Sequence, residues 1–263
     1  MDHIELTNLI IDEISIQFHC INEIKNLIRF EFVVDVLSRK RQLRTDVVSD
    51  EVDSLGSMVI PLPDNGYFYI LIRKDLQKSY EMVETISHEL IHLVDYLSFS
   101  KKYTHSKVEA ITNHDYWLAL YFYSEMRAKQ IGYLTYFKFL KNQKLLNGSV
   151  SLQLDCLSMI GTIFENSKYS LSVSISNLKK SYPGSAVKVL YNFVRHVGLI
   201  LCFSELYPSI YSLNNEIVKV YDGNLEYINK ITKLAKLDVD TVDFQLFIMN
   251  LRKIAEYYGI YLE

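Results

Sequence analysis

Thr85-Ile86-Ser87-His88-Glu89-Leu90-Ile91-His92-Leu93-Val94 is the stretch that decides the fold of this 263-residue chain. Its uncharged flanks predict a buried helix, because a solvent-exposed helix would carry Lys or Glu at some of these positions. On a helix, residues four apart lie on one face, so the imidazoles of His88 and His92 should point into the same space. Buried polar groups at this density are costly without partners, so the helix is expected to serve a site.

The spacing H-E-x-x-H is the arrangement by which two histidines on one helix bind a zinc ion. Glu89 stands beside them, where it can take a proton from a water on the metal. We therefore expect His88 and His92 to be zinc ligands and Glu89 to be the general base. The competing interpretation is a buried amphipathic helix whose histidines are satisfied by hydrogen bonds alone.

A catalytic zinc ion usually takes three protein ligands and keeps one position for water. The extended pattern H-E-x-x-H-x-x-G-x-x-H is not present, because Asp95 and Ser98 occupy the places of its glycine and last histidine. The third ligand must therefore come from elsewhere, and Glu125 is favoured. It lies in an aromatic-rich helical pattern that can return across the cleft, and Ala128 on the same face leaves room for close approach.

Other residues remain open for the third position. His105 lies between the two helical patterns, and His114 and Asp115, the main alternatives, lie at the start of the second. Asp95 is on the same helical face as His92, but its side chain is too short to reach a shared ion on a straight helix, so it suits a supporting role beside the ligands. The ordinary alternative for Glu125 is a surface ion pair with Arg127.

The H-E-x-x-H helix with Asp95, followed by Glu125-x-Arg127-Ala128, resembles the glutamate-zincin metallopeptidases. It is similar to the ATP-synthase-assembly peptidases and to metallopeptidases of bacterial mobile elements, over about residues 58–130. The resemblance implies that the two histidines and Glu125 bind zinc and that Glu89 is the base. Lys129 occupies the place where many glutamate zincins have a supporting Asp, and the cysteines of the assembly peptidases are not in the pattern.

The N-terminal part of the chain carries helical and strand patterns together. Apolar residues at helical spacing predict a first helix over about residues 4–29, and β-branched and aromatic residues predict a strand over 30–37. A second strand over 57–62 should be stopped by Pro61 and Pro63, because proline cannot donate to a ladder.

The hairpin before the motif helix bears on the substrate. Asp64-Asn65-Gly66 predicts a turn, Tyr67–Arg73 is the clearest strand pattern, and the motif helix should follow over about 77–99. In zincins an edge strand above the cleft pairs with an extended peptide, and Tyr67–Arg73 is expected to be that edge strand. An ordinary internal strand would show the same periodicity.

The remainder of the chain has a helical pattern. A helix over about 113–140 is followed by Asn147-Gly148-Ser149, the best linker candidate, and the helical pattern continues to the end. We therefore predict an α+β protein, with a zincin-like part over 1–146 (a small sheet plus the active-site helix) and a mostly helical part of unknown role over 147–263. The helical pattern over 147–263 is interrupted at Tyr182-Pro183-Gly184, Pro208 and Asp222-Gly223.

Composition narrows the class of protein. Hydrophobic content of 49% and charged content of 22% indicate a globular chain, and a net charge of −3 gives no reason to expect nucleic acid as a partner. Three scattered cysteines and an acidic N-terminus without a signal peptide indicate a cytoplasmic protein. The most apolar window, Val197–Phe203, is shorter than a membrane span, so no membrane association is expected.

The leading hypothesis is a cytoplasmic zinc metallopeptidase that acts on a peptide or protein substrate. Tyr121, one turn before Glu125, or His114 could stabilise the developing oxyanion, although Tyr121 also fits an ordinary core position. The alternatives are a catalytically inactive zincin-fold scaffold or regulatory partner-binding protein, and a zinc hydrolase of non-peptide substrates. No pattern in the sequence indicates the oligomeric state.

Overall fold

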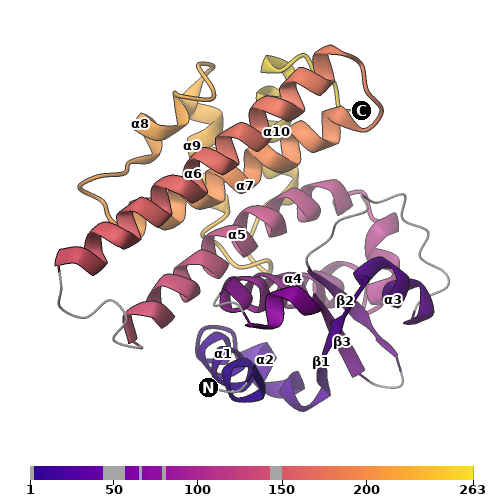
Figure 1. Ribbon diagram of the computed structural model, residues 1–263. Coiled ribbons are helices and arrows are strands. Elements are labelled where there is room, and N and C mark those ends of the chain that lie inside the picture. Colours follow the sequence, from indigo (N-terminus) through magenta and orange to yellow (C-terminus); the bar gives the residue numbers. More distant parts are fainter. Residues whose placement is uncertain (1–2, 44–56, 65–66, 79–80, 143–149, 263) are drawn as a thin grey trace. The chain divides into compact units, whose positions relative to one another are not determined.

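The computed structural model describes residues 3–43, 57–64, 67–78, 81–142 and 150–262. The chain forms two compact units, Met1–Thr112 and Asn113–Glu263 (Figure 1). The first unit combines helices with a small sheet, and in the second the elements of the described residues are helices. The predicted α+β class is therefore confirmed in its broad form.

Two short helices replace the single helix predicted over residues 4–29. α1 (His3–Gln17) and α2 (His19–Ile24) are separated by Phe18, whose backbone is extended with φ −129° and ψ 95°. A 3-10 turn, η1 (Lys25–Leu27), then leads into the first strand. Ile14 and Ile21, on either side of the break, are both 0% exposed. The prediction of one continuous helix was therefore wrong.

The first strand is earlier in the chain than predicted. β1 (Ile28–Val33) ends before Asp35, and α3 (Val36–Leu43) includes Val36 and Leu37, which were predicted to belong to the strand. Asp35 causes the change, because its carboxylate accepts hydrogen bonds from the Ser38 backbone N–H at 3.1 Å and from the Ser38 hydroxyl at 2.7 Å. This is the contact of an N-cap residue, which starts a helix.

The sheet formed by the described residues has three strands in the order β1-β3-β2, side by side in Figure 1. β3 (Tyr67–Arg73) has the predicted bounds, but it is the central strand and not an edge strand. It pairs in parallel with β1 and antiparallel with β2 (Ser57–Asp64). Its run of Ile70, Leu71 and Ile72, each 0% exposed, fits a strand covered on both faces.

The prolines of β2 interrupt its pairing without ending the strand. The strand was predicted to stop at Pro61, but it continues to Asp64, which pairs with Tyr67. The register is irregular between Ile60 and Asp64. Pro61 and Pro63 account for this, because neither has an N–H to donate to β3. Asn65 and Gly66 of the predicted turn are outside the described residues.

The motif helix is α4 (Glu81–Tyr103), which follows the 3-10 turn η2 (Lys74–Lys78) and so begins and ends later than predicted. It packs against α1, β2 and β3 within the first unit. All ten residues from Thr85 to Val94 are buried, as their uncharged flanks predicted. The helix is therefore a core element that presents its polar residues away from solvent.

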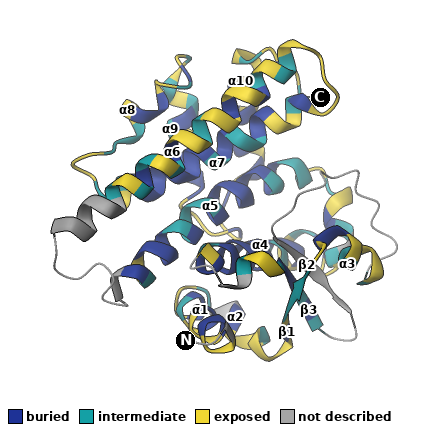
Figure 2. Ribbon diagram, in the orientation of Figure 1, coloured by how far each residue is buried: buried dark blue, intermediate teal, exposed yellow. Residues whose placement is uncertain are grey.

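The second unit is built from α5 (Trp117–Asn142) onward, after the 3-10 turn η3 (Val108–Asn113). α5 packs on α7, α6 packs on α7, and α10 packs on α9 and α5. Figure 2 shows most of α5 and much of α7 as buried. The other helices are α6 (Val150–Lys179), α7 (Ser185–Leu206), α8 (Leu213–Ile217), α9 (Leu225–Leu234) and α10 (Phe244–Tyr257).

The helical nature of the C-terminal part is confirmed, and helices end before each predicted interruption. The compact units divide between Thr112 and Asn113, which differs from the predicted boundary between residues 146 and 147. The reason is that α5 packs with α7 and α10 and so belongs to the helical unit. The predicted linker Asn147-Gly148-Ser149 is outside the described residues.

α7 is longer than Val197–Phe203, the most apolar window of the sequence. Within the described chain it is the helix long and apolar enough to cross a membrane, judged by length and composition alone. In the structure 67% of its most apolar window is buried, and core helices of soluble proteins meet the same criterion of length and composition. Its packing between α5 and α6 accounts for the apolar character.

Candidate metal centre

The two histidines of α4 bring their Nε2 atoms to 3.1 Å from each other. Their rings are 4.6 Å apart at an angle of 85°, so they meet edge to face. Two nitrogens bound at about 2.0–2.1 Å to one tetrahedral zinc ion would be about 3.3 Å apart. The pair is therefore already spaced as two ligands of one ion, and a hydrogen bond between the same two atoms is the alternative use of this geometry.

Burial separates these side chains from bulk water. His88 is 7%, Glu89 5% and His92 5% exposed. Tyr96 stacks on the ring of His92, with centroids 5.8 Å apart and an angle of 17°, which restricts how the imidazole can turn. A metal ligand benefits from such restriction, because an oriented ring needs less reorganisation when the ion binds.

Glu125 on α5 is the residue that completes a ligand group. Ligand atoms of His88, His92 and Glu125 lie within 4.8 Å of one another, and all three side chains are buried. Across the residues that the structure describes, this is the group of His, Cys, Asp or Glu side chains that could hold a metal ion. A buried His-His-Glu group of this kind can hold a metal ion, which agrees with the favoured prediction for the third ligand.

The alternative ligands are placed differently. Asp95 is 0% exposed on α4, and Asp115 is exposed at the surface. His114 is half-buried, and its Nδ1 accepts a hydrogen bond from the Tyr116 backbone N–H at 3.1 Å. His105 is exposed in a turn with φ 51°. None of these four belongs to the His-His-Glu group.

Arg127 does not form the surface pair that was the ordinary alternative for Glu125. Both residues are buried, and Arg127 donates from Nη1 to the Tyr123 hydroxyl at 2.6 Å. Its Nη2 also lies 3.6 Å from the Asp238 carboxylate. Arg127 therefore ties α5 to the segment after α9, and its place in the Glu-x-Arg-Ala segment is structural.

Arg195 is a contact of Glu125 that the sequence did not predict. Its Nη1 lies 3.0 Å from Oε2 of Glu125, and both residues belong to the helical unit. The same guanidinium lies over the ring of Tyr191, 4.8 Å from its centroid, and donates to the Tyr191 hydroxyl. A sequence signal was available, because Tyr191 and Arg195 are four residues apart and so lie on one face of a helix.

Tyr121 lies in an aromatic cluster one turn before Glu125. Its half-buried ring is 6.0 Å from Trp117, 5.2 Å from Phe122 and stacked 6.1 Å from Tyr191. These contacts are those of a packed side chain, and its role toward an oxyanion stays a prediction.

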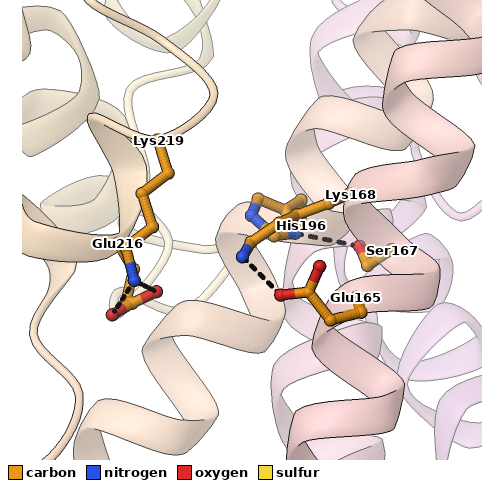
Figure 3. Close-up of polar contacts among 6 residues, drawn as sticks. All are labelled: Glu165, Ser167, Lys168, His196, Glu216 and Lys219. Carbon is orange, nitrogen blue, oxygen red and sulfur yellow. Dashed lines mark hydrogen bonds and ion pairs between the residues drawn. The ribbon is translucent and has the colours of Figure 1, made fainter.

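Another buried histidine lies in the helical unit, on α7. His196 is 0% exposed, and its Nδ1 is 3.0 Å from the Ser167 hydroxyl (Figure 3). Burial, and to a lesser extent nearby Lys168, lower the pKa of His196 to about 4 against the opposing effect of Glu165. Within the described residues its Nε2 has no hydrogen-bond partner, so the ring is a neutral core residue.

No protein-family model, curated protein or solved structure matches this chain. Fold analogy therefore gives no function, and any functional conclusion rests on the chemistry of the site.

Proposed function

We propose that the protein is a zinc-dependent metallopeptidase in which His88, His92 and Glu125 hold the ion. The observation that carries this proposal is the 3.1 Å approach of the two Nε2 atoms on a buried H-E-x-x-H helix. Two imidazoles and one carboxylate are a familiar donor set for catalytic zinc, with a position left for water. Harder ions such as Mg²⁺ and Ca²⁺ prefer sites made of oxygen ligands.

A zinc ion held by these residues would supply Lewis acidity, which lowers the pKa of a coordinated water toward neutrality. Glu89, next to His88 and only 5% exposed, is the side chain that would accept the proton of the attacking water. It would then deliver that proton to the nitrogen of the leaving amine. Tyr121 or His114 would donate toward the developing oxyanion.

Asp95 is proposed to support the ligands. It is 0% exposed, three residues after His92 on α4, so its charge must be compensated inside the protein. A buried carboxylate one turn from His92 and two turns from His88 can orient a ring N–H or balance the charge of the ion.

A peptide substrate is proposed because of the position of β2 at the edge of the sheet. β2 takes the role that was expected of β3, because it is an outer strand of the sheet formed by the described residues and packs on α4. An outer strand can pair with an extended peptide through main-chain hydrogen bonds. This favours a peptide over a small-molecule substrate, with β2 as the docking strand.

Metal analysis tests the proposal directly. We expect about one zinc per chain in the purified protein, and loss of zinc in His88→Ala, His92→Ala and Glu125→Ala. Glu81→Gln, at the exposed first residue of α4, is the control and should retain zinc. Labelled casein and a quenched peptide library then serve as substrates. A metal-free wild type would support the scaffold hypothesis, and zinc retained in all three ligand variants would overturn the site.

A further inference from the structure

The carboxylate of Glu125 is held on one side before any ion binds. Oε2 accepts a hydrogen bond from Arg195 at 3.0 Å, and the side chains of Glu125 and Arg195 are 9% and 25% exposed. A charge-assisted bond at this burial is stronger than a solvent-exposed ion pair, because less water competes for either partner. The arginine thus restricts the rotation of the carboxylate.

We propose that Arg195 is a positioning residue, which fixes Glu125 so that one carboxylate oxygen binds the arginine and the other binds the metal ion. This inference rests on the proposed function, since it assigns a role toward the same zinc ligand. It goes beyond the ligand set because Arg195 itself touches neither the ion nor the substrate.

Arg195 is itself held in place from two directions. Tyr191, four residues earlier on α7, accepts a hydrogen bond from Nη1, and its ring lies under the guanidinium. The spacing between α5 and α7 is set at Gly198, where a Cβ atom would collide with the Met126 carbonyl oxygen and lie 3.2 Å from Cβ of Lys129. Glu125 and Arg195 are each within one turn of that close contact, so their separation is well defined.

Two effects of Arg195 on metal affinity have opposite signs. Its positive charge repels a dication, so a purely electrostatic role predicts tighter zinc binding when the charge is removed. Its orientation of the carboxylate favours binding, and loss of such supporting contacts typically weakens metal affinity about 10- to 100-fold. The sign of the change therefore distinguishes the two roles.

The experiment measures zinc affinity by competition with a chromogenic chelator for wild type, Arg195→Met, Arg195→Lys and Lys188→Met. Lys188 is a matched control, because it is an exposed cation on α7 whose Nζ lies 5.0 Å from the Tyr191 ring centroid. We expect zinc to bind about 10- to 100-fold more weakly in both Arg195 variants and unchanged in the control. Lysine keeps the charge but lacks the planar guanidinium, which lies over the Tyr191 ring while its Nη1 binds Glu125.

Unfolding of the metal-free proteins shows whether each variant is folded. A further variant, Tyr191→Phe, removes the hydroxyl that holds Arg195. If Arg195→Met fails to fold, Arg195→Lys and Tyr191→Phe still report, and both should weaken zinc binding. Affinity that is equal or tighter in Arg195→Met, or equal in Arg195→Lys, would overturn the positioning role while leaving the metallopeptidase proposal intact. A wild type that binds no zinc would overturn both.

Discussion

Gly198 of α7 lies directly against the backbone carbonyl of Met126 on α5, closer than any residue with a Cβ atom could come. Gly198→Ala should therefore force the two helices apart and lower the free energy of unfolding by about 1–3 kcal/mol. Urea unfolding of the metal-free protein measures this. Gly161→Ala on α6 is the control, because a Cβ there meets nothing within 4 Å, and it should be neutral or stabilising by about 0.5–1 kcal/mol.

Glu89→Gln is expected to bind zinc and to lose hydrolysis, because the amide keeps the shape of the side chain but cannot accept the proton. The loss in kcat should be about 10²- to 10⁴-fold, the range for removal of a general base. Zinc content and peptide turnover are measured on the same preparation. Full turnover in this variant would rule out Glu89 as the base.

His196 should make stability depend on pH. Its folded pKa of about 4 lies below the ordinary histidine value of 6.5, so the unfolded state binds the proton more readily. The stabilisation from burying the neutral ring is present above pH 6.5 and is lost as the pH falls from about 6.5 to about 4, by roughly 3 kcal/mol in total.

The measurement for His196 is urea unfolding at pH 7 and pH 5 for wild type and His196→Leu. Leucine removes the titration while keeping an apolar contact with the Phe164 ring, which lies 4.8 Å from the imidazole. Wild type should lose more stability than the variant between the two pH values. Equal losses would mean that His196 is not the titrating group.

Tyr123 is expected to be important for the helical unit. Its hydroxyl donates to the Leu237 carbonyl at 2.6 Å and accepts from Arg127 at 2.6 Å, and its ring is 0% exposed. Tyr123→Phe leaves a buried guanidinium without this partner, so unfolding should become easier by about 1–3 kcal/mol. Thermal unfolding checks this against Tyr169→Phe, whose ring is 72% exposed and which should change stability by less than about 0.5 kcal/mol.

Sequence patterns predicted individual elements better than the contacts between elements. The H-E-x-x-H pattern and its apolar flanks placed His88 and His92 on one buried helix, and the run Tyr67–Arg73 has the bounds of β3. Periodicity reports only which faces of an element are covered. It could not show that β1 pairs on one side of β3, which makes that strand central.

Three misses have local or long-range physical causes. The break at Phe18 is a backbone choice that hydrophobic spacing does not encode. The early start of α3 was indicated by Asp35 and Ser38 as an N-cap contact, a signal that hydrophobic periodicity does not contain. Arg195 escaped notice because its partner Glu125 is on another helix, and only packing brings distant charges together.

The parallel pairing of β1 with β3 has a consequence for the order of folding. β2 and β3 are neighbours in sequence and can form a hairpin on a microsecond timescale. β1 pairs with β3 across α3 and β2, so this pairing must close a longer loop and should form more slowly. Ile28–Val33 should therefore gain protection from hydrogen exchange after Tyr67–Arg73 has begun to acquire it. The sheet onto which the motif helix packs is then completed by β1, which is the first strand in the sequence and the last to pair.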